Sequence, residues 1–257
     1  MPTFEVPGAV LDTELSDEGG HPVVQLHGLT SSRARDRVLD LDLGRGLSGT
    51  RLLRYDARGH GRSTGRTEPR DYCWPNLADD LLRLLDHWFP GERVHGVGPS
   101  MGCGTLLHAA LGHPERFSGL TLMVPPTAWD TRPAKASEYR TAADLIEARG
   151  LDEFVATTPQ SPPPPATVGA PPTLPDVAEP ILPALFRGAA LSDLPAPESL
   201  AAITVPVTIL AWIDDPSHPV STAEALLDVL PRATLSIART PADVAEWPSV
   251  LSADVAR

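Results

Sequence analysis

The sequence predicts an α/β fold in which helices flank a mainly parallel sheet. Short apolar runs typical of buried strands alternate along the chain with longer stretches of helical periodicity. Several of these apolar runs end in glycine-rich or polar turns, where a parallel strand would connect to a helix. A length of 257 residues with 42% hydrophobic residues suits one sizeable domain with a substantial core, with or without an inserted subdomain.

The first part of the chain predicts three strands and a helix. Residues 9–15 alternate like an early strand. Residues 22–26 predict a buried strand that ends at His27-Gly28, and residues 51–56 predict another. An amphipathic helix follows, with Pro75 near its first turn and an apolar stripe that consists of Leu77, Leu81, Leu84, Leu85 and Trp88.

The same alternation continues to the end of the chain, with one interruption. Strands are expected at residues 93–98 and 119–124, on either side of a helix at 101–111. After the interruption, a strand, a helix and a final strand are expected at residues 205–212, 222–230 and 234–238. The last helix begins near Pro241 and carries Val244 and Trp247, and Pro248 can interrupt it.

The interruption separates a core of residues 1–125 and 202–257 from an insertion of residues 126–201. Residues 141–148 have helical character, but a proline-dense stretch covers residues 159–183 and contains four consecutive prolines at 162–165. Such a run cannot continue a helix or a central strand and favours extended structure. Because the insertion falls between two sheet strands, we expect a small cap over a site at the sheet edge. A disordered surface loop is the alternative for the proline-dense part.

Charge and composition narrow the class of partner. A net charge of −12 argues against nucleic acid and anionic membranes as partners. The alternative is that the charge only aids solubility. The partner that we expect, a small-molecule substrate, comes from the motifs described below. The N-terminal residues lack the basic and apolar regions of a signal peptide, and no stretch approaches 18 apolar residues. We therefore expect a cytoplasmic protein.

The cysteines do not predict a disulfide framework, and the histidines do not predict a metal site. Cys73 and Cys103 are too few for such a framework, and Cys103 is expected in the core. His108 and His113 are five residues apart on an expected helix without accompanying carboxylates. We expect no metal and no cofactor.

The most informative feature is the pentapeptide Gly98-Pro99-Ser100-Met101-Gly102, which lies between an expected strand and an expected helix. In that context it predicts a nucleophile elbow, a sharp turn that lifts the serine hydroxyl clear of the sheet. The two glycines are needed because the turn leaves little room for side chains. Ser100 would stand at a helix N-terminus, where the helix dipole favours developing negative charge.

Other expected strand ends carry groups that could work with Ser100, since functional groups collect at the carboxyl ends of parallel strands. Asp215 follows the penultimate strand and could orient a general base. The backbone N–H groups of Leu29 and Met101 could hold an oxyanion, because backbone donors are rigid and already aimed.

In these features the chain resembles the α/β-hydrolase superfamily, most closely its branch of small esterases and enol-lactonases that need no cofactor. The residues that carry the resemblance are His27-Gly28, the turn at residues 55–63, the elbow at Ser100 and the run from Asp215 to Pro219. The resemblance implies an eight-stranded, mainly parallel sheet with Ser100 as nucleophile. It also implies Leu29 and Met101 as oxyanion-hole donors and Asp215, rather than Asp214, as the triad acid.

One part of the family pattern is missing. The family's catalytic histidine follows the last strand, but residues 236–243 contain no histidine and place Arg239 and Thr240 there. Arginine stays protonated and cannot accept a proton. His218 is the best substitute, because it shares a short proline-bracketed segment with Asp215. If one strand separates those of Ser100 and Asp215, the gap is about 10 Å, which an imidazole from the acid's own loop could bridge.

The remaining polar residues have plainer interpretations. The alternative for His218 is a hydrogen bond to nearby backbone. His27 and His60 are expected to support turns, and Arg58 and Asp56 are expected to pair within theirs. Trp129 and Trp212 either line a pocket or pack in the core.

Three functions follow from these residues. The first is a serine hydrolase that acts on a small ester, lactone or related acyl compound, with Ser100, His218 and Asp215 as its triad. The second keeps the fold but carries out a cyclisation, isomerisation or lyase step, and is motivated by the missing histidine. The third is a non-catalytic binder of a small molecule.

Overall fold

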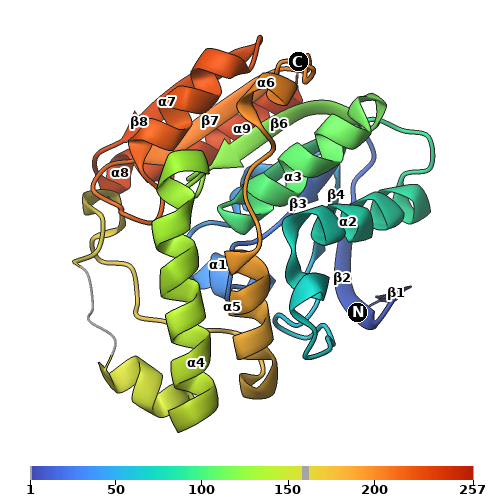
Figure 1. Ribbon diagram of the computed structural model, residues 1–257. Helices are drawn as coiled ribbons and strands as arrows, with labels where there is room; N and C mark the ends of the chain where they lie inside the picture. The colour runs from blue at the N-terminus through green and yellow to red at the C-terminus, as the bar shows by residue number, and fades with distance from the viewer. Residues whose placement is uncertain (1, 158–161, 257) are drawn as a thin grey trace.

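The computed structural model describes residues 2–157 and 162–256, and its centre is an eight-stranded sheet (Figure 1). The strand order across the sheet is β1-β2-β4-β3-β5-β6-β7-β8. The strands are β1 (Thr3–Val6), β2 (Ala9–Asp17), β3 (Pro22–Gln25), β4 (Arg51–Tyr55), β5 (Val94–Pro99), β6 (Phe117–Met123), β7 (Val207–Trp212) and β8 (Ala233–Ala238).

The sheet is mainly parallel, as the sequence predicted. The first strand, β1, pairs antiparallel with β2, and β2 pairs antiparallel with β4. All other neighbours, from β4 to β8, are parallel. The carboxyl ends of six strands therefore meet at one edge, and a single strand, β6, separates β5 from β7.

Helices cover both faces of this sheet. On one face α2 (Trp74–Trp88), α3 (Met101–Gly112), α6 (Pro197–Leu200) and α7 (Val220–Val229) contribute to one apolar cluster with the strands. The expected stripe of α2 points inward, since Leu77, Leu81 and Leu84 are all buried. On the other face α8 (Pro241–Ala245) and α9 (Trp247–Val255) bury Val244, Trp247 and Leu251 against the sheet.

The segment between β6 and β7 adds two further helices. These are α4 (Arg132–Thr157), with non-helical backbone at Gly150, and α5 (Leu182–Ala190), and they stand side by side beyond the sheet edge (Figure 1). They share a separate apolar cluster that includes Ile146, Leu185 and Phe186. The helical character expected at residues 141–148 thus belongs to a much longer helix.

The proline-dense stretch is ordered where the structure describes it. Its first residues fall within 158–161 and lie outside the described residues. From residue 162 onward it has mostly irregular structure, with short 3₁₀ turns at Pro165–Thr167 and Glu179–Ile181. The side chain of Ala166 is buried, and Val177 forms a β-bridge with His60. This part of the stretch is therefore attached to the core at Ala166 and Val177, although most of its other side chains are at least partly exposed.

Three elements differ from what the sequence predicted. The strand β1 and the short helix α1 (Arg33–Val38) were not predicted, since four to six residues give too little periodicity. The last helix is two helices, with Glu246 between them. Pro248 stands in the first turn of α9, where its missing N–H costs no helical hydrogen bond, so it helps to begin a helix there.

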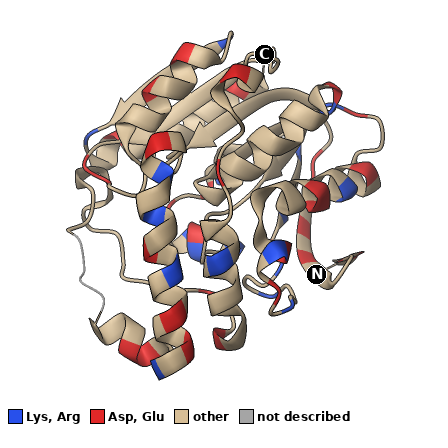
Figure 2. Ribbon diagram, viewed as in Figure 1, with Lys and Arg blue, Asp and Glu red and all other residues tan. Residues whose placement is uncertain are grey.

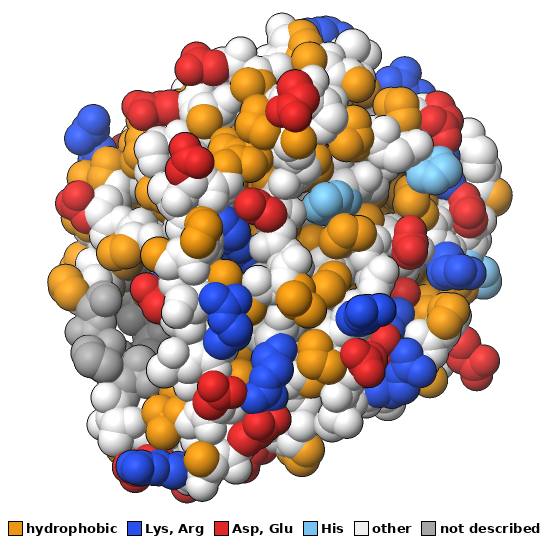
Figure 3. Space-filling view, in the orientation of Figure 1, with side chains coloured by type: hydrophobic (Ala, Val, Ile, Leu, Met, Phe, Trp, Pro, Cys, Tyr) orange, Lys and Arg blue, Asp and Glu red, His pale blue; other side chains and the backbone are white. Residues whose placement is uncertain are grey.

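The surface carries charges of both signs. Acidic and basic residues are interspersed along α4 in Figure 2, and Figure 3 shows hydrophobic side chains scattered among charged ones on the same face. Among the described residues, no helix combines the length and the apolar character needed to cross a membrane.

We predict that Gly104→Ala destabilises the fold whereas Gly112→Ala, on the same helix, does not. A Cβ at Gly104 would lie 2.3 Å from Cε3 of the buried Trp74, so helix α3 or the indole must shift, at a cost of about 1–3 kcal/mol. A Cβ at Gly112 meets nothing within 4 Å. Chemical denaturation of both variants measures this, and equal midpoints would contradict the packing described here.

Candidate active site

Ser100 occupies a strained turn between β5 and α3. Its backbone angles are φ 50° and ψ −107°, a conformation that non-glycine residues rarely adopt. The turn is held by hydrogen bonds from the Ser100 N–H to the Met123 carbonyl and from the Cys103 N–H to the Ser100 carbonyl. The expected elbow is therefore present.

The glycines on either side of the turn are explained by one neighbour, Leu26. A Cβ on Gly98 would lie 2.9 Å from Cβ of Leu26, and a Cβ on Gly102 would lie 3.1 Å from the same atom. Because Leu26 follows directly after β3, larger residues at either position would push the elbow away from the neighbouring strand.

The structure brings Ser100, His218 and Asp215 into one chain of hydrogen bonds. Oγ of Ser100 lies 2.9 Å from Nε2 of His218, and Nδ1 of His218 lies 2.7 Å from Oδ2 of Asp215. With the proton on Nδ1, His218 donates to Asp215 and accepts from the Ser100 hydroxyl. The imidazole thus bridges from the end of β7, across β6, to the elbow after β5.

A tight turn after β7 holds the acid and the imidazole together. The N–H of His218 donates to the carbonyl of Asp215, and the N–H of Ser217 donates to Oδ1 of the same residue. The N–H of Thr127, which follows β6, donates to the carbonyl of Ser217 and ties the turn to the neighbouring strand. Pro219 then precedes α7.

Asp215 is held in its charged form. Burial alone would raise the pKa of Asp215, but the hydrogen bond and charge of His218 outweigh it, with help from two further donors. These donors are the indole Nε1 of Trp212, 2.8 Å from Oδ2, and the Ser217 amide. Together they hold the pKa of Asp215 well below its usual range. An ionised carboxylate can orient the imidazole and stabilise its protonated form.

The two expected oxyanion donors flank the elbow from different segments. Met101 is the first residue of α3, and Leu29 lies in the loop that follows β3. Within residues 2–157 and 162–256, neither backbone N–H donates a hydrogen bond to another protein group. Both remain available to a ligand, and their role as oxyanion donors stays a prediction.

His27 and His60 support the loops beside Ser100. Nε2 of His27 accepts from the Ala57 N–H at 2.9 Å, and Nδ1 contacts the Gly28 carbonyl at 2.8 Å. Burial lowers the pKa of both histidines, that of His60 to about 3, so they stay neutral. His27 thus connects the loop after β3 to the turn at residues 55–63, and Nδ1 of His60 contacts the Arg58 carbonyl within that turn. Both histidines support turns, as expected.

The expected pairing of Arg58 with Asp56 is wrong. Arg58 makes two 2.7 Å hydrogen bonds to Asp80 of α2, whereas Asp56 accepts hydrogen bonds from Arg33 of α1. Each side chain leaves the turn in a different direction, so the turn is fastened to two separate helices.

A cavity of about 270 Å³ opens over Ser100 and His218. Its walls come from the loop after β3, from the end of α1, from Trp212 and from the segment between β6 and β7. That segment contributes Tyr139 and Phe186, whose rings stack 5.7 Å apart. Sequence reasoning missed these two aromatic residues, because nothing in their spacing distinguishes them from core residues.

The two tryptophans that the sequence singled out differ in their surroundings. Trp212 lines the cavity, whereas the indole N–H of Trp129 donates to the Pro195 carbonyl.

The described residues contain no cluster of three or more histidine, cysteine, aspartate or glutamate side chains suited to hold a metal ion. The polar residues that line the cavity belong to the hydrogen-bonded chain and to the loop after β3, together with Arg35 and Asp36 of α1 and Tyr139 of α4.

Comparison with known proteins places this geometry in a family. The family described as "alpha/beta hydrolase fold" matches residues 21–165, more than half of the chain. The chain belongs to this family. The resemblance inferred from the sequence is thereby confirmed.

Proteins similar in sequence to this chain are named as several different enzymes. A Bacillus subtilis protein provisionally named 2-succinyl-6-hydroxy-2,4-cyclohexadiene-1-carboxylate synthase is 31% identical over 148 residues, or 55% of this chain and 52% of its own length. The chain thus spans about half of that relative. A Caulobacter protein provisionally named carbamate hydrolase RutD is 28% identical over 83% of this chain and 85% of its own length. The 3-oxoadipate enol-lactonase 2 of Acinetobacter baylyi is 28% identical over 72% and 69%.

Solved structures agree with the fold. A carboxylesterase structure from the thaumarchaeon Nitrososphaera gargenis superposes with a TM-score of 0.76 at 18% identity, covering 97% of this chain and 94% of that one. At this identity the likeness concerns the fold alone.

We predict that Trp212→Phe lowers kcat about tenfold with little effect on the KM of a small ester. The change removes the N–H that donates to Oδ2 of Asp215, and hydrogen bonds to charged groups contribute about 1.5–3 kcal/mol. Trp88→Phe is the matched control, because the buried indole N–H of Trp88 has no partner among the described residues. Steady-state kinetics measure kcat and KM of both variants, and equal kcat values would contradict a contribution of the Trp212 N–H to the site.

We predict that Asp36→Asn stabilises the protein more at pH 8.5 than at pH 5. Asp36 lines the cavity, and burial raises its pKa to about 7 although Ser31 donates to its Oδ1. Its Oδ2 has no partner among the described residues. Since the folded-state pKa lies above the unfolded one, the folded state binds the proton more tightly, and stability falls as pH rises from about 4 through 7.

Asparagine removes this pH-dependent loss, so the stability of the variant relative to wild type should rise by roughly 2–4 kcal/mol between the two pH values. Urea denaturation at both pH values measures it. Asp228→Asn, at an exposed position on α7, is the control. A gain independent of pH would show that Asp36 does not titrate in this range.

Proposed function

We propose that this protein is a serine hydrolase that acts on a small ester, lactone or related acyl compound. The observation that carries the proposal is the chain of hydrogen bonds from Ser100 through His218 to Asp215. The family membership and the relatives named as hydrolases and lactonases support the same class of reaction.

In the first half of the proposed reaction, Oγ of Ser100 attacks the substrate carbonyl while Nε2 of His218 accepts the hydroxyl proton. The carboxylate of Asp215 stabilises the imidazolium that forms. The carbonyl oxygen becomes an oxyanion, which the N–H groups of Leu29 and Met101 would bind. When the carbon–oxygen bond to the leaving group breaks, His218 returns its proton to the leaving oxygen. An ester then releases an alcohol, whereas a lactone opens its ring and keeps the new hydroxyl on the acyl chain.

In the second half, water takes the place of the alcohol. His218 accepts a proton from water as the water oxygen attacks the acyl carbon, and a second oxyanion forms in the same place. The bond to Ser100 then breaks, and Oγ regains the proton from His218. The acid is released and the free serine is restored.

We also propose that residues 126–201 act as a cap on a core of residues 1–125 and 202–257. Tyr139 and Phe186 contribute to the wall over Ser100, which favours a role of this segment in excluding water and selecting the substrate. A cavity of about 270 Å³ suits a small substrate.

A non-hydrolytic reaction of the same site is the second candidate. It is favoured by one relative, whose provisional name is that of a synthase, and by the absence of histidine from residues 236–243. In that case the pocket and the hydrogen-bonded chain would move a proton without a lasting bond to Ser100.

We predict that a fluorophosphonate probe labels the wild-type protein, that Ser100→Ala abolishes labelling, and that His218→Asn slows it. Loss of the base removes the proton acceptor of Ser100, and loss of one triad member costs about 10⁴-fold or more in turnover. Labelling is followed by intact-mass spectrometry, and turnover is measured on a panel of short esters and lactones. His113→Asn, an exposed histidine after α3, is the control.

The outcomes separate the candidates. Labelling that survives Ser100→Ala, or wild-type protein that resists the probe, would contradict the hydrolase. Turnover that survives Ser100→Ala would favour the non-hydrolytic reaction, and saturable binding without any turnover would favour a binder.

A further inference from the structure

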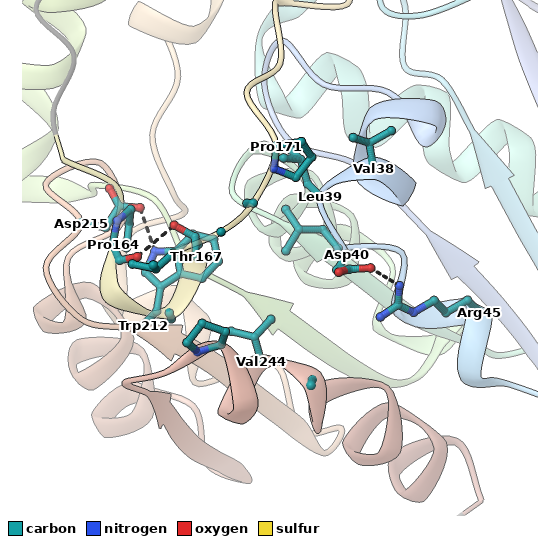
Figure 4. Close-up of a pocket in the computed structure, with 17 residues that line it drawn as sticks. Val38, Leu39, Asp40, Arg45, Pro164, Thr167, Pro171, Trp212, Asp215 and Val244 are labelled. Carbon is teal, nitrogen blue, oxygen red and sulfur yellow. Dashed lines mark hydrogen bonds and ion pairs between the residues drawn. The ribbon is translucent and has the colours of Figure 1, made fainter.

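A second cavity, of about 440 Å³, adjoins the one over Ser100 and is larger than it. Figure 4 shows Val38, Leu39 and Arg45 on one side, with Pro171 beside them. On the other side lie Trp212, Asp215, Pro164 and Thr167, with Val244 of α8 below. None of the predicted catalytic groups except Asp215 lies on its wall. Its use is therefore not accounted for by the proposed reaction.

The two cavities share part of their walls. Leu39, Leu41 and Trp212 line both of them. Trp212 stands at the boundary, with its ring edge-on to that of His218, 6.3 Å away, and stacked on Trp247 at 5.9 Å. A molecule bound at Ser100 could thus extend past Trp212 between the two leucines.

The path of the chain after β8 leaves this space open. Thr240 caps α8, and Oδ2 of Asp243 accepts hydrogen bonds from the N–H groups of Arg239 and Thr240. The chain therefore turns into α8 immediately, and no side chain of residues 236–243 is a histidine that could reach towards Ser100. Because the imidazole comes from the β7 loop instead, the space next to Asp215 stays free.

The lining favours an uncharged hydrocarbon group. Ala166, Val244 and Trp212 belong to one buried apolar cluster that forms the floor, and Leu39 and Leu41 add further apolar surface. The charged side chains on the wall besides Asp215 are Asp40 and Arg45, which form an ion pair with each other. Asp215 already accepts from Trp212, Ser217 and His218.

The position of His218 indicates which part of the substrate lies there. In the proposed reaction its Nε2 returns a proton to the leaving oxygen, so that oxygen must come within hydrogen-bond distance of Nε2. A chain that continues from this oxygen starts beside His218, and the neighbouring ring is Trp212, where the second cavity begins.

We propose that the second cavity is the subsite for the leaving group, and that the preferred substrates are esters of apolar alcohols with a medium-length alkyl chain or a ring. The inference rests on the proposed hydrolase function. A small acyl group would occupy the cavity over Ser100, and the alkyl group would extend past Trp212 to the apolar floor.

The experiment compares ethyl acetate, octyl acetate and ethyl octanoate by acid release in a pH-stat. The wild-type protein should turn over octyl acetate with a kcat/KM at least about tenfold above that of ethyl acetate, since buried methylenes strengthen binding. Ala245→Trp and Val168→Trp place an indole into the cavity from two walls, both at exposed positions that the fold tolerates. Each should remove this preference and leave ethyl acetate and ethyl octanoate within about twofold of wild type.

Ala242→Trp is the matched control, because Ala242 is exposed on the same helix α8 but does not line the cavity. Loss of the preference in this control as well would overturn the assignment. Selective loss of ethyl octanoate turnover in the two blocking variants would also overturn the assignment, because it would place the acyl chain in the second cavity. If wild type hydrolyses the esters and the blocking variants change nothing, the subsite is wrong while the hydrolase stands. If no ester or lactone is hydrolysed and Ser100 resists the fluorophosphonate, the proposed function itself fails.

Discussion

The arrangement of the whole site depends on a single turn after β7. Asp215 and His218 are three residues apart, and the turn closed by the Ser217 and His218 amides sends both side chains towards the elbow. The sheet sets the distance that the imidazole must span, because β6 lies between the strands that carry the acid and the serine. Because Asp215 and His218 share one turn, their relative position does not depend on the packing of a second loop. The bond from the Thr127 amide to Ser217 then fixes the turn relative to the sheet.

Much of the fold and part of the site could be predicted from the sequence, and the reason is local in each case. The elbow could be recognised because the strand, the two glycines and the helix all lie within about twenty residues of Ser100. The buried strands could be recognised from short apolar runs. The proximity of His218 to Asp215 could also be predicted, because both residues belong to one short segment bracketed by prolines.

Interactions between distant segments could not be predicted in this way. The turn at residues 55–63 contains Asp56 and Arg58 two positions apart, which suggested a local pair. Instead Asp56 pairs with Arg33 and Arg58 pairs with Asp80, and both partners belong to helices more distant in the sequence. Both pairs are buried, where each charge needs a partner that reaches it with two hydrogen bonds. The same limit explains why Tyr139 and Phe186 were missed, because their place over Ser100 depends on how α4 and α5 pack.

The segment between β6 and β7 is connected to the site by more than its position above it. The N–H of Asp176 donates to the carbonyl of Thr30, next to Leu29, and its carbonyl accepts from the N–H of Gly61. Its carboxylate also accepts from Oγ of Ser32. A single residue of the proline-dense stretch thus joins the loop after β3 to the turn that His27 and His60 support from the other side. In the reaction proposed here the Leu29 amide binds an oxyanion, and rigid donors stabilise such a charge only when they are held in place before it develops. Under that proposal this stretch would act through the Leu29 amide as well as through the shape of the cavity. Its proline-rich backbone suits that task, since little conformational freedom is left to lose when the contacts form.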